Sequence, residues 1–268
     1  MGRLGEDLVL LAVGADGRMA KAPRLPQALL GAELAQLATA ARIRVVRQRV
    51  VVSSTLPLGD RDVDATLARL AAVQQPPPRM SKVMRHPPRG IRAAYLARLA
   101  AQGIVRRRST RLGRERWDII RAVARADLCA RIEAIVTSDK PLSMDDATLA
   151  ALIYAAGLDA VVYPGLAGWP RRQRLEHIAR GTWPAPTVER APAAAGSPSP
   201  TNVVADGTIQ GANDQVDLDV TRATIDAVVR DSMRFIMDAA THAVSVAEHH
   251  GHSGHGGISH GGGGHHGH

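Results

Sequence analysis

Cysteine, long apolar runs and lysine are scarce in this 268-residue sequence, and the first two scarcities each exclude a class of protein. Cysteine occurs once, at Cys129, which excludes an intrachain disulfide and fits a reducing compartment. No apolar run approaches the roughly 18 residues of a membrane span, and no secretory signal opens the chain. Lysine is rare beside arginine, which is typical of a GC-rich genome. We therefore expect a soluble, cytoplasmic protein that can still lie on a membrane surface.

Catalytic motifs are also missing. The sequence holds no Gly-x-Ser-x-Gly, no phosphate-binding loop and no His-Glu-x-x-His. His86 and His177 are isolated, which favours surface or hydrogen-bonding roles over catalysis. We expect no catalytic residue, no cofactor and no dedicated metal site, so the function should be one of binding.

Basic residues are concentrated between Arg79 and Arg116. This segment carries twelve Lys or Arg and one acid, Glu115, a local charge of 12 − 1 = +11 against +9 for the whole chain. Ile91, Tyr95 and Leu99 recur within it at helical spacing, which predicts a helix ending at Gly103. The segment is either a solvated basic face or the binding site for an anion.

The residues at the start of that helix favour the second interpretation, a binding site for an anion. Pro87 and Pro88 suit a first helical position, which places Arg89 and Arg92 in or near the first turn, on one face. Cations there oppose the helix dipole, whereas a bound phosphate would gain free backbone N–H groups and two guanidinium groups.

Apolar periodicity predicts a mainly α fold, in which the helix over 29–41 is apolar on every side and should lie in the core. Ile104 to Ile120 should form an arginine-rich hairpin. The other expected elements are helices over 4–13, 29–41, 63–73, 127–136, 144–156 (with Ser143 as N-cap and Gly157 at its end) and 171–180, and one strand over 43–52.

Composition divides the chain into four parts. Residues 1–183 carry the apolar periodicity of a domain, and 184–213 read as a disordered linker of Pro, Ala, Ser and Gly. Residues 214–248 predict an amphipathic helix that docks on a partner or on itself. Residues 249–268 form a Gly- and His-rich disordered tail, for which a solubilising or pH-responsive role is preferred over a metal site.

The order of these elements resembles the Golgi phosphoprotein 3 family, in particular its actinobacterial members, over residues 4–183. Three stretches carry the resemblance: the opening LGEDLVLLAVGADG, the turn Pro57-Leu58-Gly59-Asp60 with Asp64 and Leu67, and the apolar helix from Leu149 through Tyr154. None of them is a catalytic signature, so the match depends on their order and spacing together.

The resemblance implies a mainly α fold, an apolar central helix wrapped by amphipathic helices with one or more β-hairpins, and a non-catalytic peripheral membrane protein. The best-known members of the family bind phosphatidylinositol 4-phosphate through a basic pocket and dock the cytosolic tails of glycosyltransferases. Arg89 and Arg92 match the family's two pocket arginines, and Lys21 or Arg24 is a candidate for a third cation. The hairpin is similar to the family element used in self-association, which implies homo-oligomer or membrane contact through Arg106, Arg107, Arg108, Arg111 and Trp117. Anionic phospholipids and client membrane proteins are the implied partners.

Two departures from the family pattern bear on the lipid. The pocket tryptophan of the family falls near Met19 to Lys21, where no aromatic residue stands, and a further pocket arginine falls near Leu30. A basic surface for anionic headgroups is therefore better supported than a pocket for that one phosphoinositide.

An alternative reading is a winged-helix DNA-binding protein that uses the helix and hairpin of residues 88–117. The segment before Pro88 offers no clear helix-turn-helix, so nucleic acid is not the expected partner. Trp117, Trp169 and Trp183 should be packing residues, although Trp117 could instead lie at a headgroup interface.

Overall fold

The computed structural model describes residues 4–14, 16–73, 76–109 and 115–180, together with positions 224, 227 and 228. Within these residues the chain forms helices and two antiparallel hairpins, which confirms the expected mainly α class. The helices are α1 (Leu4–Ala12), α2 (Leu25–Thr39), α3 (Arg61–Ala71), α4 (Met80–Arg85), α5 (Ile91–Ala101), α6 (Ala122–Thr137), α7 (Met144–Ala156), α8 (Asp159–Val162) and α9 (Trp169–Ala179).

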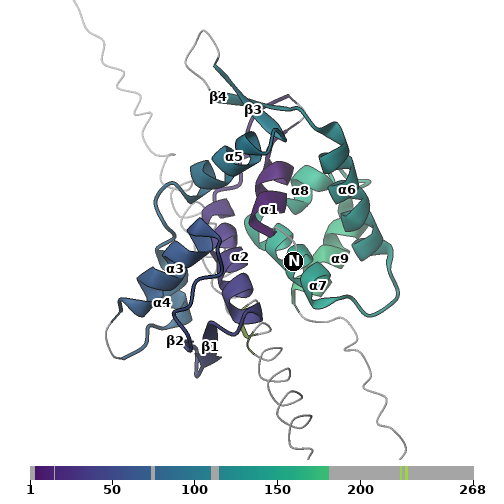
Figure 1. Ribbon diagram of the computed structural model, residues 1–268. Helices are drawn as coiled ribbons and strands as arrows, with labels where there is room; N and C mark the ends of the chain where they lie inside the picture. The colour runs from purple at the N-terminus through teal and green to yellow at the C-terminus, as the bar shows by residue number, and fades with distance from the viewer. Residues whose placement is uncertain are drawn as a thin grey trace, which may run out of the picture.

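Helix α2 is the centre of the fold. Its leucines and alanines are buried on every side, from Leu25 to Ala38, because α1, α3, α4, α5 and α7 all pack against it. In Figure 1, α3 and α4 lie on one side of α2, and α1 and α6 to α9 lie on the other. The expectation of a central apolar helix is confirmed, although α2 begins at Leu25, with Pro26 accepted in its first turn.

The strand expected over residues 43–52 is a hairpin. Strands β1 (Ile43–Val46) and β2 (Arg49–Val52) pair antiparallel, with Val46 opposite Arg49. The two turn residues, Arg47 and Gln48, both have positive φ, as a two-residue hairpin turn of this hand requires. Neither is Gly, Asn or Asp, so the sequence carried no signal for the turn and the prediction of one continuous strand was wrong.

The second hairpin was predicted and is confirmed. Strands β3 (Val105–Ser109) and β4 (Glu115–Ile119) pair with Val105 opposite Ile119, and the hairpin extends away from the helices in Figure 1. Its base is attached to the body by the segment before α2, because the Trp117 N–H donates to the Gly17 carbonyl at 2.8 Å. Gly17 has φ +73°, and a Cβ there would lie 3.2 Å from the Trp117 carbonyl oxygen.

Cap residues explain where several helices begin and end. Asp60 accepts hydrogen bonds from the N–H groups of Asp62 and Val63 at the start of α3, and Ser143 accepts from Asp146 N–H at the start of α7. Gly157 ends α7 in the left-handed region, as expected. Helices α4 and α8, of 6 and 4 residues, were not anticipated, since a stripe so short has no measurable period.

The C-terminal parts of the chain lie mostly outside the described residues, including the expected linker, most of the expected helix over 214–248 and the His-rich tail. Two described positions of that helix are informative. Thr224 is 5% exposed, and Val228 is fully buried within the main apolar core. None of the described helices is long and apolar enough to cross a bilayer.

Candidate functional site

Arg89 and Arg92 flank the beginning of α5, and both side chains are exposed. The helix begins later than expected, at Ile91, because Gly90 is its N-cap with φ +77°. Pro87 and Pro88 therefore precede the helix, which corrects their expected place in its first turn. Arg89 lies in the turn before the helix, and Arg92 lies within the first turn.

The start of α5 differs from the capped starts of α3 and α7. Those two helices have a side-chain cap and two acidic residues in the first turn, which satisfy free N–H groups and suit the helix dipole. Helix α5 has no side-chain cap and no acidic residue in its first turn. Arg89 and Arg92 are both exposed at this start, so it attracts anions.

Lys21 is exposed in the segment that leads into α2. This segment is fixed to the core, because Ala20 N–H donates to the Ala12 carbonyl and Ala22 N–H donates to the Ala20 carbonyl. Whether Lys21, Arg89 and Arg92 act on one headgroup stays a prediction.

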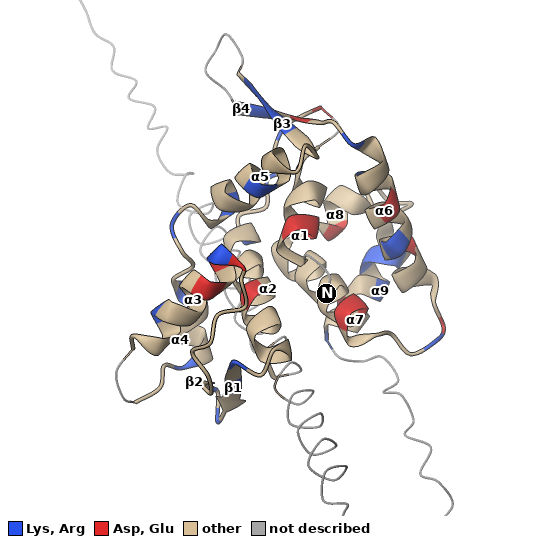
Figure 2. Ribbon diagram, viewed as in Figure 1, with Lys and Arg blue, Asp and Glu red and all other residues tan. Residues whose placement is uncertain are grey.

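The β3–β4 hairpin presents a basic outer face. Because facing residues in an antiparallel pair share a side of the sheet, Arg106 pairs with Asp118 and Arg108 with Arg116 on that face. In Figure 2 the colour of Lys and Arg marks much of β3, whereas β4 carries Arg116 and the acidic Asp118. Two like charges directly opposite each other destabilise a hairpin, so an anionic partner over Arg108 and Arg116 would relieve their repulsion.

The other hairpin residues have different environments. Arg107 is exposed opposite Trp117, and Arg111 lies outside the described residues. Trp117 is 8% exposed and belongs to the core. Of the two roles considered for Trp117, packing is the one that the structure supports, and its ring offers little surface to a membrane.

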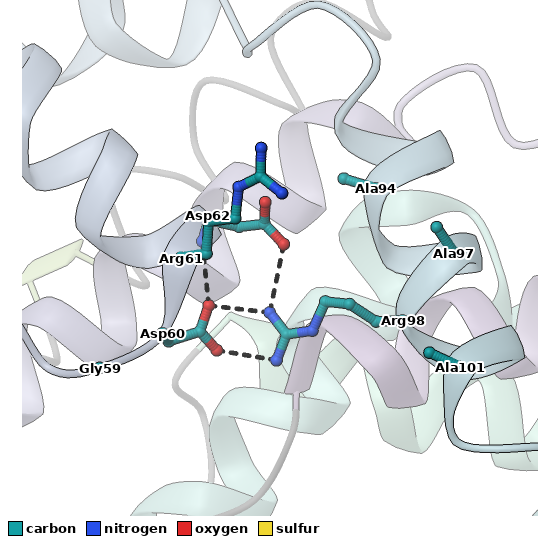
Figure 3. Close-up of a pocket in the computed structure, with 8 residues that line it drawn as sticks. All are labelled: Gly59, Asp60, Arg61, Asp62, Ala94, Ala97, Arg98 and Ala101. Carbon is teal, nitrogen blue, oxygen red and sulfur yellow. Dashed lines mark hydrogen bonds and ion pairs between the residues drawn. The ribbon is translucent and has the colours of Figure 1, made fainter.

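A separate cavity of about 610 Å³ lies between α5 and the loop before α3. Figure 3 shows the small side chains of Ala94, Ala97 and Ala101 on one side and the segment Gly59–Asp62 on the other, with Arg98 between them. Neither Arg89 nor Arg92 lines this cavity. The cavity was not anticipated from the sequence, in which Arg98 is one of the twelve basic residues between Arg79 and Arg116.

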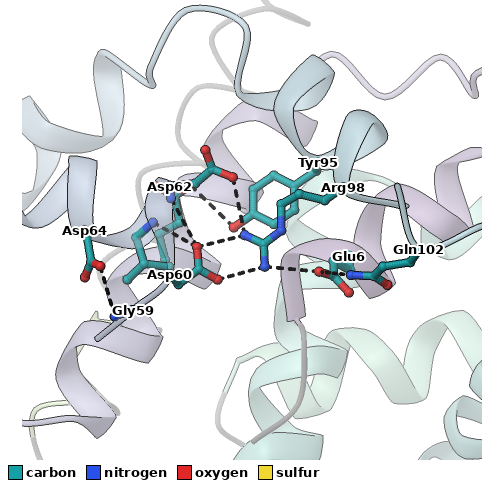
Figure 4. A network of polar contacts seen from close by, with 10 residues as sticks. Glu6, Gly59, Asp60, Asp62, Asp64, Tyr95, Arg98 and Gln102 are labelled. Carbon is teal, nitrogen blue, oxygen red and sulfur yellow. Dashed lines mark hydrogen bonds and ion pairs between the residues drawn. The ribbon is translucent and has the colours of Figure 1, made fainter. Parts of the chain in front are cut away.

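Arg98 is the centre of a network of carboxylates (Figure 4). Its guanidinium group donates to both carboxylate oxygens of Asp60 at 2.8 Å, to Asp62 at 3.3 Å, and lies 3.1 Å from Glu6. Gln102 also donates to Glu6, and the Arg98 guanidinium stacks over the Tyr95 ring at 5.2 Å. The network joins α1, α3 and α5.

The electrostatics of the network follow from these contacts. Burial alone would raise the pKa of Asp60, but hydrogen bonds from Arg98 and from the backbone of Val63 and Asp62 outweigh it and hold this pKa below its ordinary value. Burial would likewise lower the pKa of Arg98, but the hydrogen bond and charge of Asp60 and the charge of Glu6 raise it. Arg98 stays charged and is committed to structure.

Glu33 of α2 lies beside this network and is 1% exposed. It accepts hydrogen bonds from the hydroxyls of Thr66 at 2.7 Å and Tyr95 at 3.4 Å. Burial is the main cause that raises the pKa of Glu33 to about 7, with a smaller contribution from the charge of Asp62. The hydroxyl of Thr66 and the charge of Arg69 act in the opposite direction.

The two candidate surfaces differ in what they can do chemically. The carboxylates around Arg98 are paired, and the cavity is lined by no Ser, Cys, His or Lys that could act as a nucleophile or base. Within the described ranges, no cluster of His, Cys, Asp and Glu is placed to hold a metal ion. The start of α5 and the outer hairpin face carry arginines available to an anion.

Comparison with known protein families identifies the family of this chain. A family model described as Golgi phosphoprotein 3 (GPP34) matches residues 4–195. The chain belongs to the Golgi phosphoprotein 3 family. No curated protein matches it in sequence. The matched span includes every helix and strand from α1 to α9.

The structure gives a physical reason for one of the sequence motifs shared with the Golgi phosphoprotein 3 family. In the Pro57-Leu58-Gly59-Asp60 turn, Gly59 has φ +81°. The Asp64 carboxylate accepts from Leu58 N–H at 2.6 Å and from Gly59 N–H at 3.0 Å. The motif therefore fixes the loop that presents Asp60 both to α3 as its cap and to Arg98.

Proposed function

We propose that this chain is a non-catalytic peripheral membrane protein that binds anionic phospholipid headgroups, of the phosphoinositide type, through Arg89 and Arg92. The observation that carries the proposal is the start of α5, which has no side-chain cap, no acidic residue and two exposed arginines. A phosphate there accepts from free N–H groups and from both guanidinium groups. Lys21 is the third residue proposed for the headgroup.

The hairpin supports the same function. Its outer face carries Arg106, Arg108 and Arg116, and a negatively charged leaflet attracts each such residue by about 1 kcal/mol. Arg107 and Arg111 belong to the same proposed contact, with self-association of the hairpin as its second mode. Client membrane proteins and a cytoplasmic, peripheral location are part of the proposal and follow from the family.

The winged-helix alternative gains little support from the structure. A recognition helix needs polar side chains toward the base edges. Apart from Arg92, the exposed residues of α5 are Ala93, Ala97 and Ala101, and its Arg98 is bound to Asp60 and Asp62.

Replacing both Arg89 and Arg92 by alanine should weaken binding to anionic vesicles more than tenfold, because each charge-assisted pair contributes about 1.5–3 kcal/mol. The free energy of unfolding should hold or rise slightly, since two charges that oppose the helix dipole are removed. Vesicle co-sedimentation and chemical denaturation measure the two effects.

The matched control is the double variant Arg44→Ala, Arg47→Ala, which removes the same charge from exposed positions of the β1–β2 hairpin. It should change binding by less than about threefold, the loss of diffuse attraction alone. Equal losses in the two double variants would show that binding is diffuse and that no headgroup site exists at α5.

A further inference from the structure

Two exposed large apolar side chains of the described residues lie close together in sequence, in elements other than the one that carries the arginines of the proposed site. Leu166 is 90% exposed and Trp169 is 53% exposed, whereas Trp169 was expected to pack. They stand in the connection between α8 and α9 and at the first residue of α9. We call this pair the Leu166–Trp169 knob.

The knob is held rigidly. Arg172 donates to the carbonyl oxygens of Tyr163 at 2.7 Å and Gly165 at 2.9 Å, and these two bonds fix the loop to α9. Trp169 N–H donates to the Leu166 carbonyl at 3.0 Å, so the two residues close one turn. A Cβ on Gly168 would lie 2.4 Å from the Tyr163 carbonyl oxygen, so only glycine permits this tight closure.

Rigid exposure of these two side chains has a cost in water, since apolar surface is favoured where water is excluded. A flexible loop could fold a leucine back against the protein, but this one is bonded in place. Holding the pair outward lowers the entropy cost of any later insertion, because the bound geometry already exists in the free protein.

The charges around the knob indicate which partner it fits. Residues 159–180 contain four arginines and two acids, Asp159 and Glu176. Glu133 pairs with Arg171 at 2.7 Å, while the hydrogen bonds found for Arg172 and Arg174 go to carbonyl oxygens. With Glu133 included, the surroundings keep a net charge of 4 − 3 = +1, in a chain whose net charge is +9. A second copy would present the same positive charge, and a nucleic acid would gain nothing from an exposed leucine.

We propose that the Leu166–Trp169 knob inserts into the interfacial layer of an anionic membrane. Trp favours the headgroup depth, where its ring is partly buried and its N–H is hydrated, and leucine reaches the acyl boundary. Arg172 and Arg174 stay at the level of the phosphates. This inference rests on the proposed function and adds an apolar anchor that the headgroup site does not supply.

The test uses the full chain with vesicles of equimolar phosphatidylglycerol and phosphatidylcholine. The double variant Leu166→Ser, Trp169→Ser should bind them roughly tenfold or more weakly than the wild type, because its apolar anchor is gone. The matched control is Val46→Ser, Leu56→Ser, which alters side chains 50% and 64% exposed on another part of the surface. It should bind as the wild type does. Leu166→Ser alone serves if the double variant fails to fold.

Depth is read separately with vesicles whose acyl chains carry bromine, which quenches tryptophan fluorescence at short range. In a Trp183→Phe background, the bound protein should be quenched, and Trp169→Phe should abolish the quenching, because Trp117 is buried in the core. Three outcomes would overturn the proposed insertion of the knob. They are vesicle binding without quenching, equal binding of the two double variants, and a change in oligomer size in place of a change in vesicle affinity.

The failure of this inference is distinguishable from that of the proposed function. If Arg89→Ala, Arg92→Ala abolishes binding while the knob variants bind normally, the headgroup site stands and the anchor does not. If the knob variants lose binding and the arginine variant does not, the anchor stands and the headgroup site fails. If the wild type binds no vesicle, both are overturned.

Discussion

Replacing Arg98 by alanine should destabilise the protein by about 2–4 kcal/mol at neutral pH, although Arg98 lies in the most basic part of the sequence. The reason is that Arg98 balances three carboxylates, those of Glu6, Asp60 and Asp62, of which Glu6 is 4% exposed. Without the guanidinium group, these three carboxylates lose the cation that they share. Chemical denaturation measures the loss, and Arg92→Ala, at an exposed position of the same helix, should change stability by less than about 0.5 kcal/mol.

The dependence on pH separates this electrostatic effect from lost packing. Because the pKa of Asp60 is depressed in the folded state, its contribution to stability is present above its unfolded pKa of 3.8 and is lost as pH falls through the folded value. Arg98→Ala removes the main partner of Asp60, so the difference in stability between the variant and the wild type should shrink below about pH 4. A difference that is the same at pH 7 and at about pH 3 would assign the loss to the stacking of Arg98 on Tyr95.

Glu33→Gln should make the protein more stable than the wild type at pH 8, by about 3 kcal/mol, and nearly equal to it at pH 5. The folded pKa of Glu33 is raised to about 7 from 4.5, so the folded state holds a proton that the unfolded state has released. The contribution of a group shifted in this direction is fully present below pH 4.5 and is lost as pH rises through 7. Glutamine imitates the protonated carboxyl group at every pH, so the variant does not lose this contribution.

The groups facing Glu33 are Thr66, Asp62 and Arg69 from α3 and Tyr95 from α5. Unfolding curves in urea at pH 5, 6, 7 and 8 give the comparison. Glu133→Gln is a control of opposite sign, because the hydrogen bond from Arg171 lowers the pKa of Glu133. Parallel stability curves for the wild type and Glu33→Gln would show that Glu33 does not change its protonation state in this range.

Local chemistry made much of the fold predictable. Ser143 and Gly157 mark the ends of α7 because capping depends on residues adjacent in sequence. The central position of α2 followed from a helix apolar on every side. The β1–β2 hairpin was missed because Arg47 and Gln48 adopt positive φ without the residues that favour it.

The candidate site was less predictable, because its contacts join distant parts of the chain. In the sequence, Arg92 and Arg98 are two similar members of the basic segment between Arg79 and Arg116. In the structure Arg92 is exposed, whereas Arg98 is bound to carboxylates from α1 and α3. Trp117 packs in the core as expected, whereas Trp169, which was also expected to pack, is exposed at the start of α9, beside the loop that Arg172 fixes. No periodicity in the sequence distinguishes these cases.

Binding of this protein to anionic membranes is tested most directly by comparing its affinities for vesicles and for duplex DNA at one salt concentration. Wild-type protein is titrated with phosphatidylcholine vesicles that contain phosphatidylglycerol, cardiolipin or phosphatidylinositol phosphates, with pure phosphatidylcholine vesicles, and with a DNA duplex. We predict saturable binding to the anionic vesicles, strongest for phosphate monoester headgroups, and weak binding to neutral vesicles and DNA. Tighter binding to the duplex than to every anionic vesicle would contradict it.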